Sequence, residues 1–340
     1  MSFQIPVVLF IFKRYETVFK ILDVLRKAGI SKLYLVGDGP RNKEEEKCIL
    51  ECREKIEDQI NWPCEVIKDY ATTNRGVYEN IGKGAIRVFE HESRAIFLED
   101  DNLPELSFFE YCKQLLDKYE DNDKVLWING TNYLTEYNPV DGADYMFTRQ
   151  LLPCGWASWR DKFCKYYDGE LVTTNNSEKL SRFKNSYKSK LLYSQQFHSI
   201  MTTKRKLEVG DPVSWDFQMC FSLRSNGMFG ISPKYNQIKN IGVDENSTHG
   251  GTSMTIEMTN RFCGMSSQPL IFPLKDPKKI EVDEEYEKKI EKIITWPMST
   301  QIKYRICYFI KPFLGLNKYD SMSLYLKRRK KRGKNEKNSN

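Results

Sequence analysis

The sequence lacks any apolar run long enough to cross a membrane. Its first apolar stretch, "VVLFIF", ends at Lys13 and Arg14 and is far shorter than the roughly 18 residues that a membrane span requires. The stretch is also too short for a secretory signal, and no cleavage pattern follows it. We therefore expect a cytoplasmic protein, for which peripheral contact with the inner face of the plasma membrane stays open.

The sequence lacks the cysteine, histidine and glycine patterns that are typical of zinc sites, disulfide frameworks and phosphate-binding loops. The nine cysteines are scattered without a C-x-x-C pair, and there are only three histidines. A zinc site and a disulfide framework are both disfavoured, so we expect reduced cysteines. The first predicted strand is followed by "FIFKRYET", which has no glycine and therefore no glycine-rich phosphate loop.

Positive charge is concentrated at one end of the chain. Residues 327–340 contain eight Lys or Arg and one Glu, a charge of +7, which equals the net charge of the whole chain. The remaining residues therefore sum to zero. A neutral body argues against a nucleic-acid-binding domain, and we expect no nucleic-acid partner.

The first half of the 340 residues alternates short apolar runs with amphipathic stretches. The predicted strands are 6–12, 32–37, 64–68, 94–99 and 124–129, and the predicted helices are 15–28, 44–59, 77–90 and 106–119. This alternation predicts an α/β fold with a mostly parallel, Rossmann-like sheet and flanking helices. After residue 131 the pattern weakens, and only the second part of "GDPVSWDFQMCFSLRSNG" and residues 290–308 and 309–325 have helical spacing.

Polar motifs follow the predicted strands. "KR", "DGPRN", "NRG" and "EDD" come after the first four, and the carboxyl ends of parallel strands meet at one edge of a sheet, where ligands bind. Glu99, Asp100 and Asp101 stand in a row after the fourth strand, and their mutual repulsion would be relieved by a cation. The alternative is an inert, solvated acidic loop.

The order of these motifs, continued by "GWASW", "SWDFQ" and "NSTHG", resembles nucleotide-sugar glycosyltransferases of the GT-A fold. The resemblance is to the group that includes N-acetylglucosaminyltransferase I and bacterial sugar transferases of cell-surface polysaccharide pathways. It covers about residues 3–270. It implies a GT-A domain over 1–270, with a nucleotide-binding half (1–130) and an acceptor half (131–270). We expect a helical extension (271–325) and a basic, disordered tail (326–340) to follow.

The resemblance also implies roles for individual residues. Asp101 corresponds to the ligand of Mn2+ or Mg2+, with Asp100 and Glu99 against the ribose or the sugar. Asp38 corresponds to the acid that reads the uracil edge; its alternative is a turn residue. The other implied donor-binding residues are Arg14, Asn74, Arg75, Ser247, Thr248 and His249, and Lys83 is a weaker candidate near phosphate.

Asp216 in "SWDFQ" corresponds to the catalytic base of the family. Its aromatic neighbours favour a raised carboxylate pKa, which suits a base, whereas a plain helix-start acid is the alternative. Asp211 is a rival for the same role. The indole rings of Trp156 and Trp159 would either stack against a sugar ring in the site or belong to the hydrophobic core.

Together these features predict metal-dependent, inverting transfer of a sugar from a UDP-sugar donor to a glycan or lipid-linked acceptor. The alternatives are a sugar-nucleotidyltransferase, which the missing glycines disfavour, and a non-catalytic nucleotide-sugar or glycan-binding adaptor.

The C-terminal segment 300–340 combines apolar and basic residues. The apolar residues between 302 and 313 fall at spacings of three and four: Ile302, Ile306, Phe309, Ile310 and Phe313. A helix with such a stripe and a basic flank suits an anionic membrane surface, which would bring the chain close to a lipid-linked acceptor. Ordinary core packing of the helix is the alternative.

Overall fold

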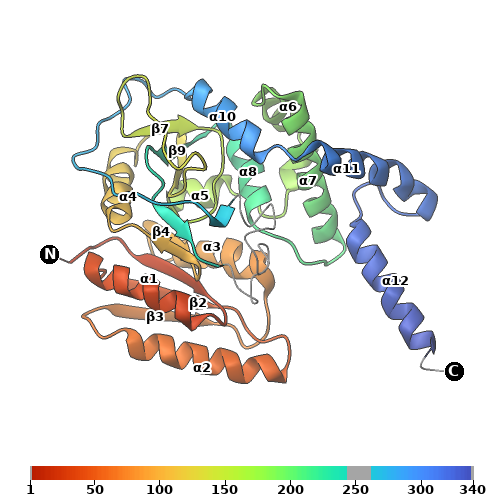
Figure 1. Cartoon of the computed structure of the whole chain (residues 1–340), viewed down its shortest axis with the longest axis horizontal. Helices are drawn as coiled ribbons and strands as arrows, with labels where there is room; N and C mark the ends of the chain where they lie inside the picture. The colour runs from red at the N-terminus through yellow and green to blue at the C-terminus, as the bar shows by residue number, and fades with distance from the viewer. Residues whose placement is uncertain (1, 243–261, 338–340) are drawn as a thin grey trace.

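The computed structural model describes residues 2–242 and 262–337, and its centre is an eight-stranded sheet (Figure 1). The strand order is β3-β2-β1-β4-β8-β6-β9-β7. The strands are β1 (Val7–Ile11), β2 (Lys32–Gly37), β3 (Glu65–Tyr70), β4 (Arg94–Glu99), β6 (Val125–Asn129), β7 (Tyr145–Thr148), β8 (Trp156–Trp159) and β9 (Phe229–Pro233). Only β8 and β7 run antiparallel to their neighbours among these eight strands. The predicted α/β fold with a mostly parallel sheet is therefore confirmed.

A second, two-stranded sheet lies beside the first. It pairs β5 (Asn102–Pro104) with β10 (Ile238–Asn240) in antiparallel register, so that Asn240 stands opposite Asn102. Because β5 begins three residues after β4 ends, this small sheet fixes the chain just beyond the three acids. The pairing brings residues near 240 to the carboxyl end of β4.

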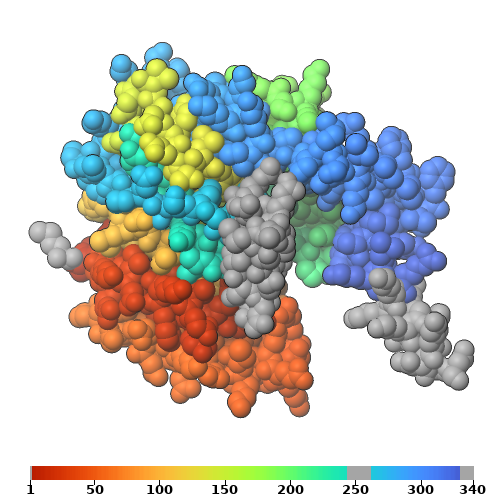
Figure 2. All heavy atoms as spheres, viewed as in Figure 1, coloured from red at the N-terminus to blue at the C-terminus, as the bar shows by residue number. Residues whose placement is uncertain are grey.

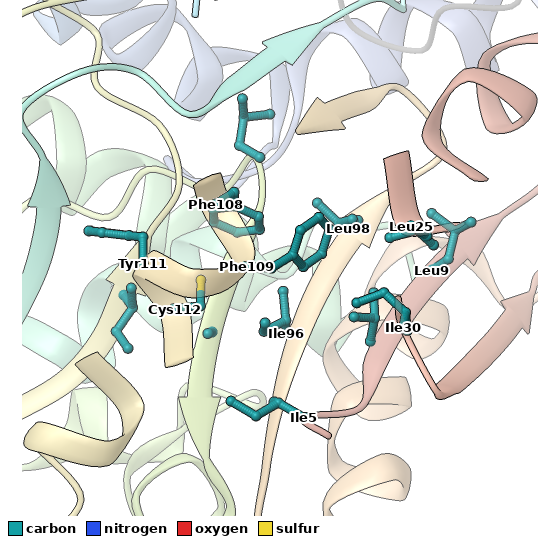
Figure 3. Packing of buried hydrophobic residues seen from close by; sticks show 14 of the residues in the cluster. Ile5, Leu9, Leu25, Ile30, Ile96, Leu98, Phe108, Phe109, Tyr111 and Cys112 are labelled. Atoms are coloured by element: carbon teal, nitrogen blue, oxygen red, sulfur yellow. The ribbon is translucent and has the colours of Figure 1, made fainter. Parts of the chain in front are cut away.

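Helices cover both faces of the main sheet. They are α1 (Tyr15–Ala28), α2 (Lys43–Gln59), η1 (Tyr78–Gly82), α3 (Lys83–Phe89), α4 (Ser107–Lys118), α5 (Arg160–Tyr166), η2 (Val172–Asn175), α6 (Ser177–Asn185), α7 (Lys190–Glu208) and α8 (Asp216–Ser225). One core joins the sheet to α1, α2 and α4, and Figure 3 shows Leu25, Phe108 and Phe109 packed over Leu9 and Leu98 in it. A second core joins the opposite face to η1, α3, α5 and α8.

Burial on both faces explains why the first strands are continuous apolar runs. All five residues of β1 are buried, with Val7, Leu9 and Ile11 in the first core and Val8 and Phe10 in the second. Such strands need apolar side chains at every position, whereas strands with one solvent-exposed face alternate apolar and polar residues. The sheet therefore holds its carboxyl edge, with the loops that follow each strand, in a fixed place.

Three helices and a 3-10 turn form the C-terminal part: α10 (Glu284–Ile294), α11 (Met298–Ile310), η3 (Lys311–Leu314) and α12 (Met322–Lys337). The first packs on the body through buried Tyr286 and Ile290, and α11 and α12 extend away from the sheet (Figure 1). The predicted helix over 290–308 is interrupted between α10 and α11, because Pro297 lacks an N–H and restricts Trp296. The tail predicted as disordered is instead helical as far as Lys337, since Lys, Arg and Leu are good helix formers.

Candidate functional site

The three acids lie in the turn between β4 and β5, held by one asparagine. Asn102 donates from Nδ2 to Asp101 Oδ1 at 2.7 Å, and its Oδ1 accepts from the N–H of Gly155 at 2.9 Å. The Asn102 side chain is almost fully buried, so these bonds are shielded from water. The turn is thereby fixed to the start of β8, and its carboxylates are confined to the sheet edge.

Arg14, which follows β1, provides the cation nearest to these acids among the described residues. Its guanidinium forms an ion pair with Asp100 and a second one with Asp101, where Nη2 and Oδ2 are 3.1 Å apart. Burial lowers the pKa of Arg14, but the two carboxylates raise it by more, so the guanidinium stays charged. The structure therefore brings together three residues that the sequence predicts for the donor site.

Negative charge exceeds positive charge in this cluster. Burial raises the pKa of the Glu99 carboxyl well above its usual range, and the charges of Asp101 and Asp100 add to the effect. Asp216, from a distant part of the sequence, raises the pKa of Glu99 further, and Arg14 opposes it. Three acids thus act on the Glu99 carboxyl, and among the described residues Arg14 is the guanidinium that opposes them.

The cluster suits a divalent cation together with an anionic ligand. Hard cations take carboxylate oxygens, and Mg2+ is usually held by one or two carboxylates, with phosphate and water completing its shell. No group of three or more His, Cys, Asp or Glu within residues 2–242 and 262–337 is arranged to hold a metal ion. Within residues 2–242 and 262–337, no acceptor meets the buried Nη1 of Arg14, so this donor is open to an anion as far as those residues are concerned. A cation at these carboxylates would have to complete its shell with ligand oxygens and water, and the metal role of Asp101 stays a prediction.

Asp38, after β2, organises the neighbouring loop. Its Oδ1 accepts from the N–H of Gly39 (2.8 Å) and of Arg75 (2.6 Å), and its Oδ2 accepts from Asn74 Nδ2 (2.9 Å) and the N–H of Gly76 (3.1 Å). The loops after β2 and β3 are therefore tied together by one buried carboxylate. The sequence groups Asp38, Asn74 and Arg75, and the structure brings them together.

The Arg75 side chain is held by an acid that the sequence did not single out. Asp69 in β3 accepts from Arg75 Nη2 at 2.7 Å and from Arg87 Nη2 at 2.7 Å. Burial raises the pKa of Asp69, but the two guanidiniums outweigh it and lower the pKa overall. Lys83 belongs to the helix surface instead, where it pairs with Glu79 at 2.6 Å.

The two candidates for a catalytic base occupy different places. Asp216 is the first residue of α8 and accepts a hydrogen bond from Ser214 Oγ. Asp211 forms an ion pair with Arg328 of α12. The charge of Asp216 raises the pKa of Glu99, whereas Asp211 pairs with the C-terminal helix, so Asp216 stays the preferred candidate for the base.

Both tryptophans considered for a sugar platform are buried. Trp156 stacks between Phe97 and Trp127, with ring centroids 3.8 and 4.2 Å away. Trp159 donates from Nε1 to the carbonyl of Leu116 at 3.0 Å. The core alternative therefore holds for both, because β8 is inserted between β4 and β6 in the middle of the sheet.

Ser247, Thr248 and His249 lie outside the described residues, but both flanking segments reach the site. A Cβ placed on Gly242 would stand 2.3 Å from Asp101 Oδ2, so the backbone at this position passes close against the acids. On the far side, the charge of Asp101 raises the pKa of Cys263, after the larger effect of burial. The predicted contact of 247–249 with the donor stays a prediction.

Comparisons with known proteins do not assign a family. No protein-family model matches the chain, and no curated protein matches it. Among solved structures, the UTP-bound UGPase of Acinetobacter baumannii is 9% identical over 71% of this chain and 88% of its own, with a TM-score of 0.34. The 4-diphosphocytidyl-2C-methyl-D-erythritolsynthase of Anaerococcus prevotii is 13% identical over 72% and 92%, with a TM-score of 0.34. HddC of Yersinia pseudotuberculosis is 12% identical over 46% and 78%, with a TM-score of 0.31. At these TM-scores the likeness decides nothing about activity.

Proposed function

We propose that the chain is a metal-dependent glycosyltransferase that moves a sugar from a UDP-sugar to a glycan or lipid-linked acceptor. The observation that carries the proposal is the acid cluster after β4. It places three consecutive carboxylates, with the guanidinium of Arg14 beside two of them, at the edge where parallel sheets bind ligands. Asp101 would hold the Mn2+ or Mg2+ ion, which would offset charge on the departing diphosphate.

The protein's own groups supply the remaining steps. Arg14 would bind a diphosphate oxygen through Nη1, which has no acceptor among the residues that the structure describes. Asp216 would accept the proton of the acceptor hydroxyl as that oxygen bonds to the anomeric carbon, while the bond from that carbon to UDP breaks and UDP keeps the electron pair. Attack from the face opposite UDP inverts the anomeric centre. The bond from Ser214 would hold the Asp216 carboxylate in one orientation for this transfer.

The uracil contact proposed for Asp38 needs a local change. Each oxygen of this carboxylate already accepts two N–H bonds, which fills the usual lone-pair positions. A uracil N3–H would therefore have to replace one donor, and the Asn74 side chain is the one that can turn away without moving the backbone. The alternative role of Asp38 is to shape the loop that lies against the base.

Calorimetry and product release test the proposal. Wild-type protein should bind UDP more tightly with manganese than without it, and should release UDP from at least one of a panel of UDP-sugars. Asp101→Asn should lose the manganese effect but keep its unfolding temperature, while Asp121→Asn, an exposed acid in the turn before β6, should behave as wild type. An unchanged manganese effect in Asp101→Asn rules out Asp101 as the ligand, and no UDP release with any donor favours a binding adaptor.

The second candidate is nucleotidyl transfer, because two of the solved structures whose fold is similar are a UDP-glucose pyrophosphorylase with UDP-glucose and a UTP-bound UGPase. Their TM-scores of 0.34 carry no argument between the two activities. The chain after β1 opposes this candidate, since it has no glycine-rich phosphate loop. Incubation with UTP and a sugar 1-phosphate separates the candidates, because only nucleotidyl transfer releases pyrophosphate.

A further inference from the structure

The helix α11 exposes large apolar side chains on one side. Nine of the fifteen exposed large hydrophobic residues of the described chain lie between 298 and 326, and Phe309 and Phe313 are 70% and 90% exposed. Six of them form what we call the α11 apolar surface: Met298, Ile302, Ile306, Phe309, Ile310 and Phe313. Their spacing of three and four residues puts them on one side of the helix and of the 3-10 turn that continues it.

The other side of α11 is already occupied by the protein. Tyr304 stacks on Trp296 with a centroid distance of 4.4 Å, and His198 of α7 contacts both Tyr304 and Tyr308. These rings line a cavity of about 510 Å³ between α7 and α11. Phe309 borders this cavity and contacts Tyr308 edge-on at 5.9 Å between ring centroids, but it stays 70% exposed. The helix is therefore anchored by its aromatic side, and core packing does not account for its exposed side.

Basic residues flank the α11 apolar surface and favour an anionic partner. Lys303 and Arg305 are exposed on the same helix and flank the apolar stripe. The segment 327–340 that follows carries +7, on a body whose charge is zero. Figure 2 shows the described C-terminal helices, in blue, at one side of the molecule. An apolar stripe between basic residues matches the acyl boundary and the headgroups of an anionic membrane.

A second copy of the chain fits this surface less well. Each copy carries a net charge of +7, and like net charges oppose the association of two copies. No helix within residues 2–242 and 262–337 is long and apolar enough to cross a bilayer. We propose that the α11 apolar surface docks the protein onto the surface of an anionic phospholipid membrane. This proposal does not depend on the proposed transferase activity.

Vesicle sedimentation with the full chain tests the proposal. Wild-type protein should pellet with phosphatidylcholine vesicles that contain phosphatidylglycerol, and much less with phosphatidylcholine alone. Raising the salt from about 0.1 M to about 1 M should release it, because the Debye length falls from ~10 to ~3 Å. Phe309→Ser with Phe313→Ser should lower the vesicle affinity by about tenfold or more, since two apolar groups no longer enter the lipid.

A matched control uses two apolar residues that are equally exposed elsewhere. Val140→Ser with Ile271→Ser, at positions 93% and 85% exposed, should leave vesicle binding unchanged. The proposal fails if wild-type protein does not pellet at low salt, or if both double variants bind alike. It also fails if sedimentation velocity shows a wild-type dimer that Phe309→Ser with Phe313→Ser dissociates while vesicle binding is absent, because the occupant is then a second copy.

Discussion

The carboxyl edge of the sheet buries charged side chains, and the α11 apolar surface exposes apolar ones. Both depart from the usual pattern in which apolar side chains are buried and charged side chains are exposed. At the sheet edge, Arg14, Asp38 and Asp100 are charged and mostly shielded from water. On α11, Phe309 and Phe313 are large, apolar and exposed. Buried polar groups and exposed apolar patches are the informative departures in a soluble fold, because each one costs free energy.

The two departures differ in how far the protein compensates for them. Around Asp38, four N–H donors satisfy the carboxylate, so the loop is complete in itself. Around Glu99 and on α11, the compensation within the described residues is incomplete, through excess negative charge in one case and exposed rings in the other. The two proposals made above fill these gaps from outside: a cation would offset the carboxylates at the first place, and a lipid surface would cover the rings at the second.

The largest expected effect is at the acid cluster. Asp216→Asn should lower turnover by ~10²–10⁴, with little change in donor affinity, because an amide cannot accept the acceptor's proton. Asp211→Asn is the control, since that acid pairs with Arg328. Single-turnover rates together with donor titrations check both variants. A loss of donor affinity without a loss of rate would make Asp216 a binding residue.

This acid cluster also shows where sequence reasoning succeeds. Strands β1, β2, β4 and β6 were predictable because burial on both faces requires continuous apolar runs. The edge strand β3 has no fully buried residue, and its prediction rested on the alternation of strands and helices. The meeting of Asp38 with Asn74 and Arg75 followed from parallel topology alone. The pairing of Arg14 with Asp100 did not, because it depends on side-chain reach across two loops.

The second half was less predictable for physical reasons. Strands β7 and β8 have four residues each, and β8 enters the sheet between β4 and β6, so its burial depends on contacts distant in sequence. The burial of Trp156 was therefore open until that insertion was known. The 19-residue helix α7 has only four buried residues, too few for a clear apolar stripe. The spacing of the apolar residues predicted the stripe on α11 correctly. It did not decide whether that stripe packs in the core or contacts a membrane.

The loop at Asp38 should show the largest effect on folding. Asp38→Ala removes the acceptor of four N–H bonds in a buried place and should lower the free energy of unfolding by ~2–4 kcal/mol. Urea unfolding measures it, with Asp123→Ala, an exposed acid in a turn, as the control that should stay near wild type. If Asp38→Ala lowers the free energy of unfolding no more than Asp123→Ala does, the loop does not depend on this carboxylate.

The anchored side of α11 should respond to acid. Burial lowers the pKa of His198 to about 4 from its ordinary 6.5, so the unfolded chain binds a proton that the folded chain does not between these values. Stability should therefore fall as the pH drops from 6.5 towards 4, by about 1–2 kcal/mol because solvent screens the partly exposed ring. His198→Gln should flatten this part of the profile. An unchanged slope would show that the acid sensitivity arises elsewhere.

The exposed side of α11 should show the smallest effect on folding. Phe309→Ser with Phe313→Ser should change the free energy of unfolding by no more than about 0.5 kcal/mol, because both side chains already contact water. Tyr308→Ser on the same helix should cost more, about 1–3 kcal/mol, because that ring packs on His198 and Tyr319. Chemical unfolding without lipid measures both changes. If the two variants lose equal stability, the exposed side is packed against protein in solution, and its apolar residues serve folding rather than membrane contact. If only Tyr308→Ser is destabilised, the exposed rings of Phe309 and Phe313 do not stabilise the folded protein. They can then enter a lipid surface without a loss of contacts within the protein.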